Sequence, residues 1–345
     1  MDILSAMAWR KTCHENYAHV TSSLTRSRQK IVGMFLSAAS ALITMLGDHN
    51  SVLGGDAALS FILRTAEIRV NTLDIYVPSS EYDLFVDRIL RDGRFTHEIE
   101  GSSETEFDSN YSHCRQISRC TEISVTNGRK IAIWQSMICG PCMPIAKSTN
   151  TIHMNFVNDV AFGCAYPRLT LARQGLMSNL ASESCQFPWE PESFSRLRRA
   201  GFSFAYVPYQ LPGYTPSPQW RPTYPGRYPC FGHLYICQAQ ERRFDDPGSM
   251  VGLTDPLSTP VSDIKQRGQA PFGVMVVWRL VSSFICNHDN WHFNDYILPR
   301  SVWAISLVAV ESDFYKYDRP IKRARTRQGK AEAIVPGRRL RSATI

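Results

Sequence analysis

The sequence contains no apolar run long enough for a comfortable membrane span. Its longest, IVGMFLSAASALITML at Ile31–Leu46, has 16 residues and includes three hydroxyl side chains. A membrane helix needs about 20 consecutive, mostly apolar residues, and this run begins too late for an ordinary signal peptide. We therefore expect no membrane partner, and we interpret the run as a single buried helix that ends near Gly47.

Secretion signals and a compact disulfide framework are also missing. The ten cysteines are scattered over 345 residues, and a chain of this length can bury a full core without disulfide bonds. We expect an intracellular, reducing location, cytoplasmic or nuclear.

Most of the chain lacks net charge of either sign. From Arg319 to the end there are nine Lys or Arg residues against Glu332 alone, so this segment carries +8 and the other 318 residues carry −1. The segment 319–345 is poor in apolar residues and is predicted to be a disordered basic tail. Residues 319–341 could contact nucleic acid nonspecifically or act as a nuclear-import signal, and a solvated tail without a partner is equally compatible.

Apolar periodicity and turn residues predict an α/β or α+β protein with a small mixed β-sheet and flanking helices. We expect a loosely ordered segment at 1–30, a core at 31–175 and a C-terminal elaboration packed on it at 176–318. A proline-rich, extended loop at 208–229 is expected to cover the core.

Three local predictions follow from turn chemistry and spacing. Apolar residues at helical intervals predict a helix that ends near Gly93. The polar stretch Glu98–Cys114 is interpreted as a loop. The alternating runs in ISVTNGRKIAIW predict a β-hairpin with a type I′ turn at Asn127-Gly128.

The stretch LGGDAALSFILRTAEIRVNTLDIYVP, residues 53–78, bears most directly on chemistry. It predicts a short strand, a turn at Gly54-Gly55, a helix from Asp56 to about Arg64, and a strand that carries Asp74. Enzymes that transfer nucleotides need a backbone turn that holds the phosphates and two or three carboxylates that bind Mg²⁺. Only the turn is complete here.

The glycine pair followed by the strand TLDIYV resembles the signature of the nucleotidyltransferase fold. With GRKIAIWQS and STNTIHMNFVNDVAFGCAYPRLTL, residues 50–175 resemble uncharacterised proteins of mushroom-forming fungi built on that fold, with a weaker similarity in HFNDYILPRSVWAISL. The resemblance implies a nucleotidyltransferase-like sheet, nucleotide contacts at Gly54 and Gly55, and Mg²⁺ at Asp74 if nucleotide binding persists.

The sequence departs from that signature at three positions. Thr72 stands where the first metal carboxylate is expected, and the strand KIAIWQ lacks a third carboxylate. Asp56 would cap the helix and repel phosphate. We therefore expect a noncatalytic, nucleotidyltransferase-like protein, either a pseudoenzyme or an interaction module, with an incomplete metal site and a protein partner.

Several other interpretations remain open for the same residues. An active, metal-dependent nucleotidyltransferase could combine Asp74 with Asp56 or Glu122. Alternatively, Asp74 is a structural aspartate bonded to the backbone or to Arg69, and the glycines form only a tight turn that needs a positive φ. A third interpretation of the function is that the protein binds nucleic acid through its basic tail.

A redox site is the remaining chemical candidate. Cys139 and Cys142 enclose Gly-Pro in the tetrapeptide of thioredoxins, although the preceding strand belongs to a hairpin and not to a βαβ unit. Adding Cys114 and Cys120 gives four cysteines that superficially suggest zinc, but only one of the two pairs has the spacing of a zinc finger. We interpret the tetrapeptide as a strand-to-helix turn with incidental thiols.

Overall fold

A computed structural model describes ten parts of the chain, and every structural statement below concerns them. They are residues 1–65, 67–107, 115–138, 140–178, 190–214, 230–238, 240–255, 274–278, 280 and 304–308. All of the described residues belong to one compact unit, 1–309. The predicted basic tail and most of the proline-rich loop, 215–229, lie outside the described residues.

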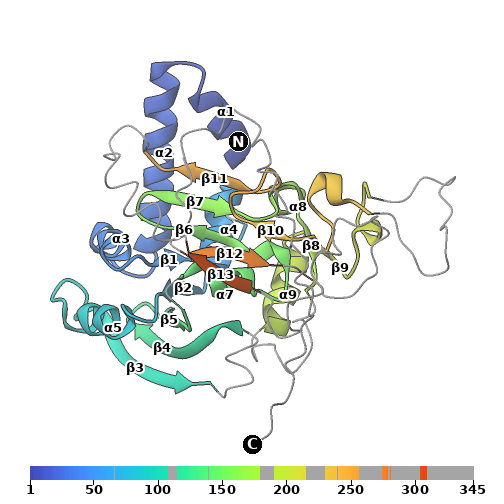
Figure 1. Cartoon of the computed structure of the whole chain (residues 1–345). Helices are drawn as coiled ribbons and strands as arrows, with labels where there is room; N and C mark the ends of the chain where they lie inside the picture. Colours follow the sequence, from blue (N-terminus) through green and yellow to red (C-terminus); the bar gives the residue numbers. More distant parts are fainter. Residues whose placement is uncertain are drawn as a thin grey trace, which may run out of the picture. The chain divides into compact units, whose positions relative to one another are not determined.

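The described part of the chain begins with three helices and then mixes strands with helices (Figure 1). The α-helices are α1 (Ile3–Arg10), α2 (His14–Gly33), α3 (Ala39–Asp48), α4 (Gly55–Leu63), α5 (Tyr82–Arg91), α7 (Cys142–Ala146), α8 (Pro167–Leu171) and α9 (Glu190–Arg199), with short 3₁₀ turns η1 (Thr151–His153), η4 (Pro208–Gln210) and η5 (Gly232–Leu234). The strands are β1 (Val52–Leu53), β2 (Thr72–Val77), β3 (Ile99–Glu106), β4 (Ile117–Val125), β5 (Lys130–Ser136), β6 (Asn155–Val157), β7 (Ala161–Cys164), β8 (Gln174–Leu176), β9 (Ser203–Ala205), β10 (Arg242–Arg243), β11 (Met250–Leu253), β12 (Val274–Trp278) and β13 (Ala304–Val308).

A mixed sheet organises these elements and confirms the α/β class. Eight strands follow the order β11-β7-β6-β1-β2-β5-β4-β3. Only β2 and β5 run parallel within it, and the other neighbouring pairs are antiparallel. The sheet is larger than the small one expected, because β11 joins it from the C-terminal half of the chain.

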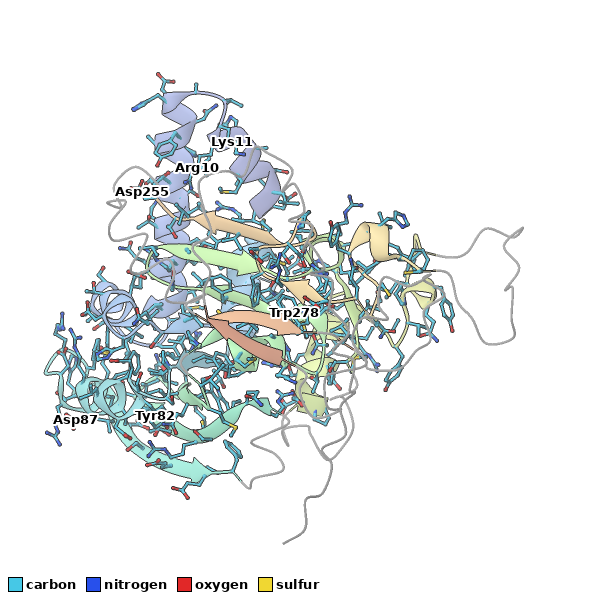
Figure 2. All side chains as sticks on the ribbon, in the orientation of Figure 1. Arg10, Lys11, Tyr82, Asp87, Asp255 and Trp278 are labelled. Carbon is cyan, nitrogen blue, oxygen red and sulfur yellow. The ribbon has the colours of Figure 1, made fainter. Side chains whose placement is uncertain are left out.

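The sheet buries apolar side chains on both faces. On one face, Leu73 and Ile75 of β2 pack with Phe61 of α4 and other residues of the helices. The opposite face packs against later elements, among them the fully buried Trp278 of β12 (Figure 2), whose indole N–H donates to the hydroxyl of Tyr166 at 3.1 Å. Leu73, Ile75 and Val77 of β2 therefore share one buried face, and Tyr76 packs against the core on the other face.

The first thirty residues are helical and well packed, in contrast to the loose segment expected. Ile3 and Ala6 of α1 are fully buried. Arg10, also buried, donates from Nη1 to the carbonyl oxygens of Leu253 at 2.9 Å and Thr254 at 3.1 Å. These bonds tie α1 to the end of β11.

The long apolar run at 31–46 does not form the single helix expected. It covers the end of α2, a break, and most of α3. In the break, the backbone N–H of Ser37 donates to the Glu98 carboxylate at 2.9 and 3.0 Å, and the Ser37 hydroxyl donates to it at 2.7 Å. A distant side chain thus satisfies a donor that a continuous helix would have used internally.

The helix predicted to end near Gly93 is confirmed as α5, whereas the loop predicted at 98–114 is wrong over its described part. Residues 99–106 form β3, paired with β4 along their length. Polar residues enter a strand here because β4 provides a hydrogen-bonding partner. Local propensity did not reveal that pairing.

The hairpin of β4 and β5 is confirmed, but its turn differs from the type I′ expected. The Val125 N–H donates to the Arg129 carbonyl at 3.0 Å, which leaves a three-residue loop. Gly128 has a φ of +75°, whereas Asn127 is not among the described residues with positive φ. A three-residue loop needs only one left-handed residue, and glycine supplies it.

No helix in the described ranges combines the length and the apolar character that crossing a bilayer requires.

Replacing Arg10 with Met should destabilise the protein by about 1–3 kcal/mol, because two buried carbonyl groups lose their donor. Lys11→Met is the matched control, since Lys11 is the exposed C-cap residue of the same helix (Figure 2), and it should change stability by less than about 0.5 kcal/mol. Urea unfolding measures both. Equal effects of the two substitutions would show that α1 is not docked through Arg10.

Candidate functional site at the glycine pair

The glycine pair links β1 to α4 in a turn that is pressed against β2. The Gly54 N–H donates to the Asp74 carbonyl at 2.9 Å, and Gly55 begins α4 with a φ of +54°. The predicted order of strand, turn, helix and strand is confirmed. A Cβ on Gly54 would lie 2.5 Å from the Tyr76 ring, so the close approach also requires glycine.

Asp74 lies directly over this turn and is half-buried. Its Oδ1 accepts a hydrogen bond from the indole Nε1–H of Trp134 at 3.0 Å, and its Oδ2 would lie 2.2 Å from a Cβ placed on Gly55. The expected alternative partner, Arg69, is exposed and makes no described bond with this carboxylate. The second oxygen thus rests against the turn where a ligand phosphate would have to approach.

The pKa of Asp74 is raised to about 6. Burial is the main cause, and the nearby charge of Asp56 adds to it, while the bond from Trp134 opposes it. Asp74 can therefore take up or release a proton near pH 6.

Asp56 is in the first turn of α4, but it does not cap the helix as expected. Its Oδ1 lies 3.2 Å from His153 Nε2, and its Oδ2 accepts from Arg196 Nη2 at 2.8 Å. Burial opposes ionisation of Asp56, but its bonds and charge interactions with His153 and Arg196 outweigh burial and lower its pKa. Both carboxylate oxygens are occupied by protein.

The tautomer of His153 follows from its other neighbour. The side-chain oxygen of Asn150 accepts from the Ile152 N–H at 3.0 Å, so its Nδ2 faces His153 Nδ1 at 3.3 Å as a donor. Nδ1 must then accept, and the ring proton lies on Nε2, from which it is donated to Asp56. Neither ring nitrogen is available to a substrate in this arrangement.

A second buried ion pair fixes the N-terminal end of α9. Glu190 Oε1 accepts from Arg115 Nη2 at 3.0 Å and from the Thr149 hydroxyl at 3.1 Å. Arg196, in the last turn of the same helix, reaches Asp56. Helix α9 is therefore held at both ends by charged groups of the core.

The strand beside Asp74 has no carboxylate at the adjacent position. In the parallel pair of β2 and β5, Ala132 lies opposite Asp74, and Glu122 on β4 lies opposite Ala132. Strand spacing of about 4.8 Å places Glu122 about 10 Å from Asp74. Glu122 instead accepts from Lys130 Nζ at 3.0 Å.

Aromatic side chains cover the rest of this face. Tyr76 and Phe107 both lie nearly parallel to Trp134, with ring centroids 6.4 and 6.2 Å away and interplanar angles of 22°. Together with Ala132 they form an apolar layer beside Asp74. The layer contributes to the burial that raises the pKa of Asp74.

The residues present do not fit a magnesium ion. Magnesium needs near-octahedral oxygen ligands and usually two carboxylates or a carboxylate with phosphates. Asp74 has one oxygen bonded to Trp134 and the other against the turn, and Asp56 is bonded on both oxygens. Within the described ranges, His, Cys, Asp and Glu form no cluster of three or more that could hold a metal ion.

The tetrapeptide that contains Cys142 lies between β5 and α7, as the strand-to-helix interpretation predicted. Cys142 is fully buried at the start of α7, and burial raises the pKa of its thiol. Cys139 and Cys114 lie outside the described residues, while Cys120 is buried on β4. The thiol of Cys142 is thus poorly suited to attack a substrate as a thiolate.

Sequence reasoning missed three participants, His153, Arg196 and Trp134. Each lies far along the chain from the residue it contacts, and none carries a local motif. Trp134 could have been found from the parallel register of β2 and β5, because it is two residues beyond the position opposite Asp74.

Comparisons with protein-family models, curated proteins and solved structures gave no match to this chain.

Asp74→Asn should stabilise the protein at pH 7.5 by about 1–3 kcal/mol. An acid whose pKa is higher in the folded state loses stability as pH rises from about 4 to about 6, and the amide removes that loss. The Asn side-chain oxygen can still accept from Trp134. Urea unfolding at pH 4 and pH 7.5 measures the difference, and an equal gain at both values would contradict the raised pKa.

Gly55→Ala should destabilise the protein by about 2–5 kcal/mol, because left-handed strain adds to the overlap with Asp74. Gly128→Ala provides the matched control. It has a similar positive φ with nothing within 4 Å of the added Cβ, so only strain of about 1–2 kcal/mol is expected. Thermal or urea unfolding that gives the same cost at both glycines would exclude the steric contribution of Asp74.

Proposed function

We propose that this protein is a noncatalytic, nucleotidyltransferase-like protein that acts as a pseudoenzyme or interaction module. The observation that carries the proposal is that both carboxylates at the glycine pair already bind other side chains of the protein. Asp56 binds His153 and Arg196, and Asp74 binds Trp134. A metal-dependent transferase needs such oxygens open to an ion and a triphosphate.

The glycine turn is also less suited to binding phosphate than an ordinary helix N-terminus. A helix N-terminus attracts phosphate through its N–H groups and its positive dipole end. Here two carboxylates lie beside that terminus, and the lowered pKa of Asp56 keeps it ionised at neutral pH. Repulsion from Asp56 therefore opposes the dipole.

One observation favours the alternative, an active nucleotidyltransferase. The pKa of Asp74 is raised and that of Asp56 is lowered, and such a divergence is found in acid and base pairs of enzymes. For catalysis, Arg196 and His153 would have to leave Asp56 when substrate binds. Glu122 is the weaker second carboxylate because two strand spacings separate it from Asp74.

Calorimetric titration with ATP, GTP, CTP and UTP, with and without Mg²⁺, tests the proposal. We expect no magnesium-dependent heat of binding for any of the four. Magnesium-dependent binding that is lost in Asp74→Ala would overturn the proposal and support the active enzyme. The variant Arg196→Met serves as a further control, because it removes the cation that holds Asp56 and tests whether release of that carboxylate restores metal binding.

A further inference from the structure

Strand β3 is an edge strand of the eight-stranded sheet, and all of its residues after Ile99 are exposed to solvent. Residues 100–106, EGSSETE, are all solvent-exposed. Figure 1 shows β3 as the outermost strand, next to β4. Long exposed edge strands are usually blunted in proteins, because their backbone groups can pair with another chain.

The outward-facing backbone groups of β3 can be assigned from its register with β4. The Phe107 N–H donates to the Ser118 carbonyl at 3.2 Å, so residue 107 bonds inward. In an antiparallel pair such residues alternate. The N–H and C=O groups of Ser102, Glu104 and Glu106 therefore point away from β4, and the described chain offers them no bonding partner.

The side chains on this edge are acidic. Glu100, Glu104 and Glu106 lie on β3, which contains no Lys or Arg. Arg119 of β4 reaches Glu104 at 3.1 Å, but it also bonds Asp83 of α5 at 2.8 Å, so it is shared between two carboxylates. The edge thus keeps an excess of negative charge.

The negative charge of the β3 edge favours some partner strands over others. A second copy of the chain paired through β3 would place like charges on adjacent strands, which destabilises cross-strand pairs. A strand with basic side chains at alternate positions would instead place cations beside Glu104 and Glu106. These two residues share one face because side chains alternate along a strand.

We propose that the β3 edge binds an extended, Arg- or Lys-rich segment of a partner protein by strand addition. Backbone bonds to Ser102, Glu104 and Glu106 supply the pairing, and the glutamates select basic side chains. This inference deepens the interaction-module part of the proposed function and rests on it. It is independent of whether the glycine pair binds a nucleotide.

Titration of the full chain with a synthetic peptide tests the inference. The probe alternates Arg and Thr over eight residues, the length of β3, with blocked ends. The same peptide methylated at every backbone nitrogen carries the same charge but cannot add a strand, because it has no N–H left to donate. We expect the first peptide to bind at least tenfold more tightly than the second, with binding weakened by salt.

Variants of β3 separate backbone pairing from charge. Ser102→Pro removes one outward N–H without changing the charge, and edge strands tolerate proline where the N–H faces solvent. It should weaken binding at least tenfold relative to Ser102→Ala. Glu104→Gln keeps the backbone and should weaken binding severalfold, whereas Asp87→Asn on the exposed side of α5 (Figure 2) should have no effect.

Amide hydrogen exchange locates the added strand. Peptide binding should slow exchange at Ser102, Glu104 and Glu106, while Ser103 and Thr105 already bond to β4. Equal binding of both peptides, no binding of either, or unchanged exchange on β3 would each overturn the inference. Self-association that Ser102→Pro abolishes, without peptide binding, would overturn it in favour of a second copy. Triphosphate titration of the same samples tests the glycine-pair proposal separately.

Discussion

The close contact between the glycine turn and β2 is the constraint on which the site depends. Gly54 donates to the backbone of Asp74, and Gly55 leaves room for the Asp74 carboxylate. Side chains at these two positions would separate β1 from β2 and move α4. One tight turn therefore sets both the register of the central strands and the distance between the two aspartates.

Because the two aspartates lie close together, their negative charges repel each other, and the surrounding residues stabilise the charge of only one of them. Two carboxylates close together in a partly buried position cannot both ionise without cost. His153 and Arg196 stabilise the charge on Asp56, and Asp74 is left in apolar surroundings with a raised pKa. The ion pair between Arg196 and Asp56 also docks helix α9, because Arg196 belongs to that helix. The geometry holds Asp56 as a structural anion, and Asp74 remains the only one of the two that can exchange a proton near neutral pH.

Strands β2 and β3 show opposite relations between sequence and structure. The β2 sequence alternates apolar and polar residues, so its two faces could be assigned from the sequence alone. Strand β3 consists mainly of serine and glutamate, which give little strand signal. Its conformation depends on the ladder with β4, and it has no apolar face to bury. Such a strand contributes little to the core, which makes its exposed edge available for another role.

The sequence by itself determined the local features that depend on residues close together in the chain. These include the glycine turn between a strand and a helix, helix α5 with its apolar face, and the hairpin with Gly128. It also identified Asp74 as the one carboxylate on β2. Only the tertiary structure decided which distant side chains meet Asp56 and Asp74, that the apolar run at 31–46 is broken, and that the first thirty residues are packed. The physical reason is that hydrogen bonds and ion pairs between distant segments depend on how the chain is packed. Helix and turn preferences act over a few residues.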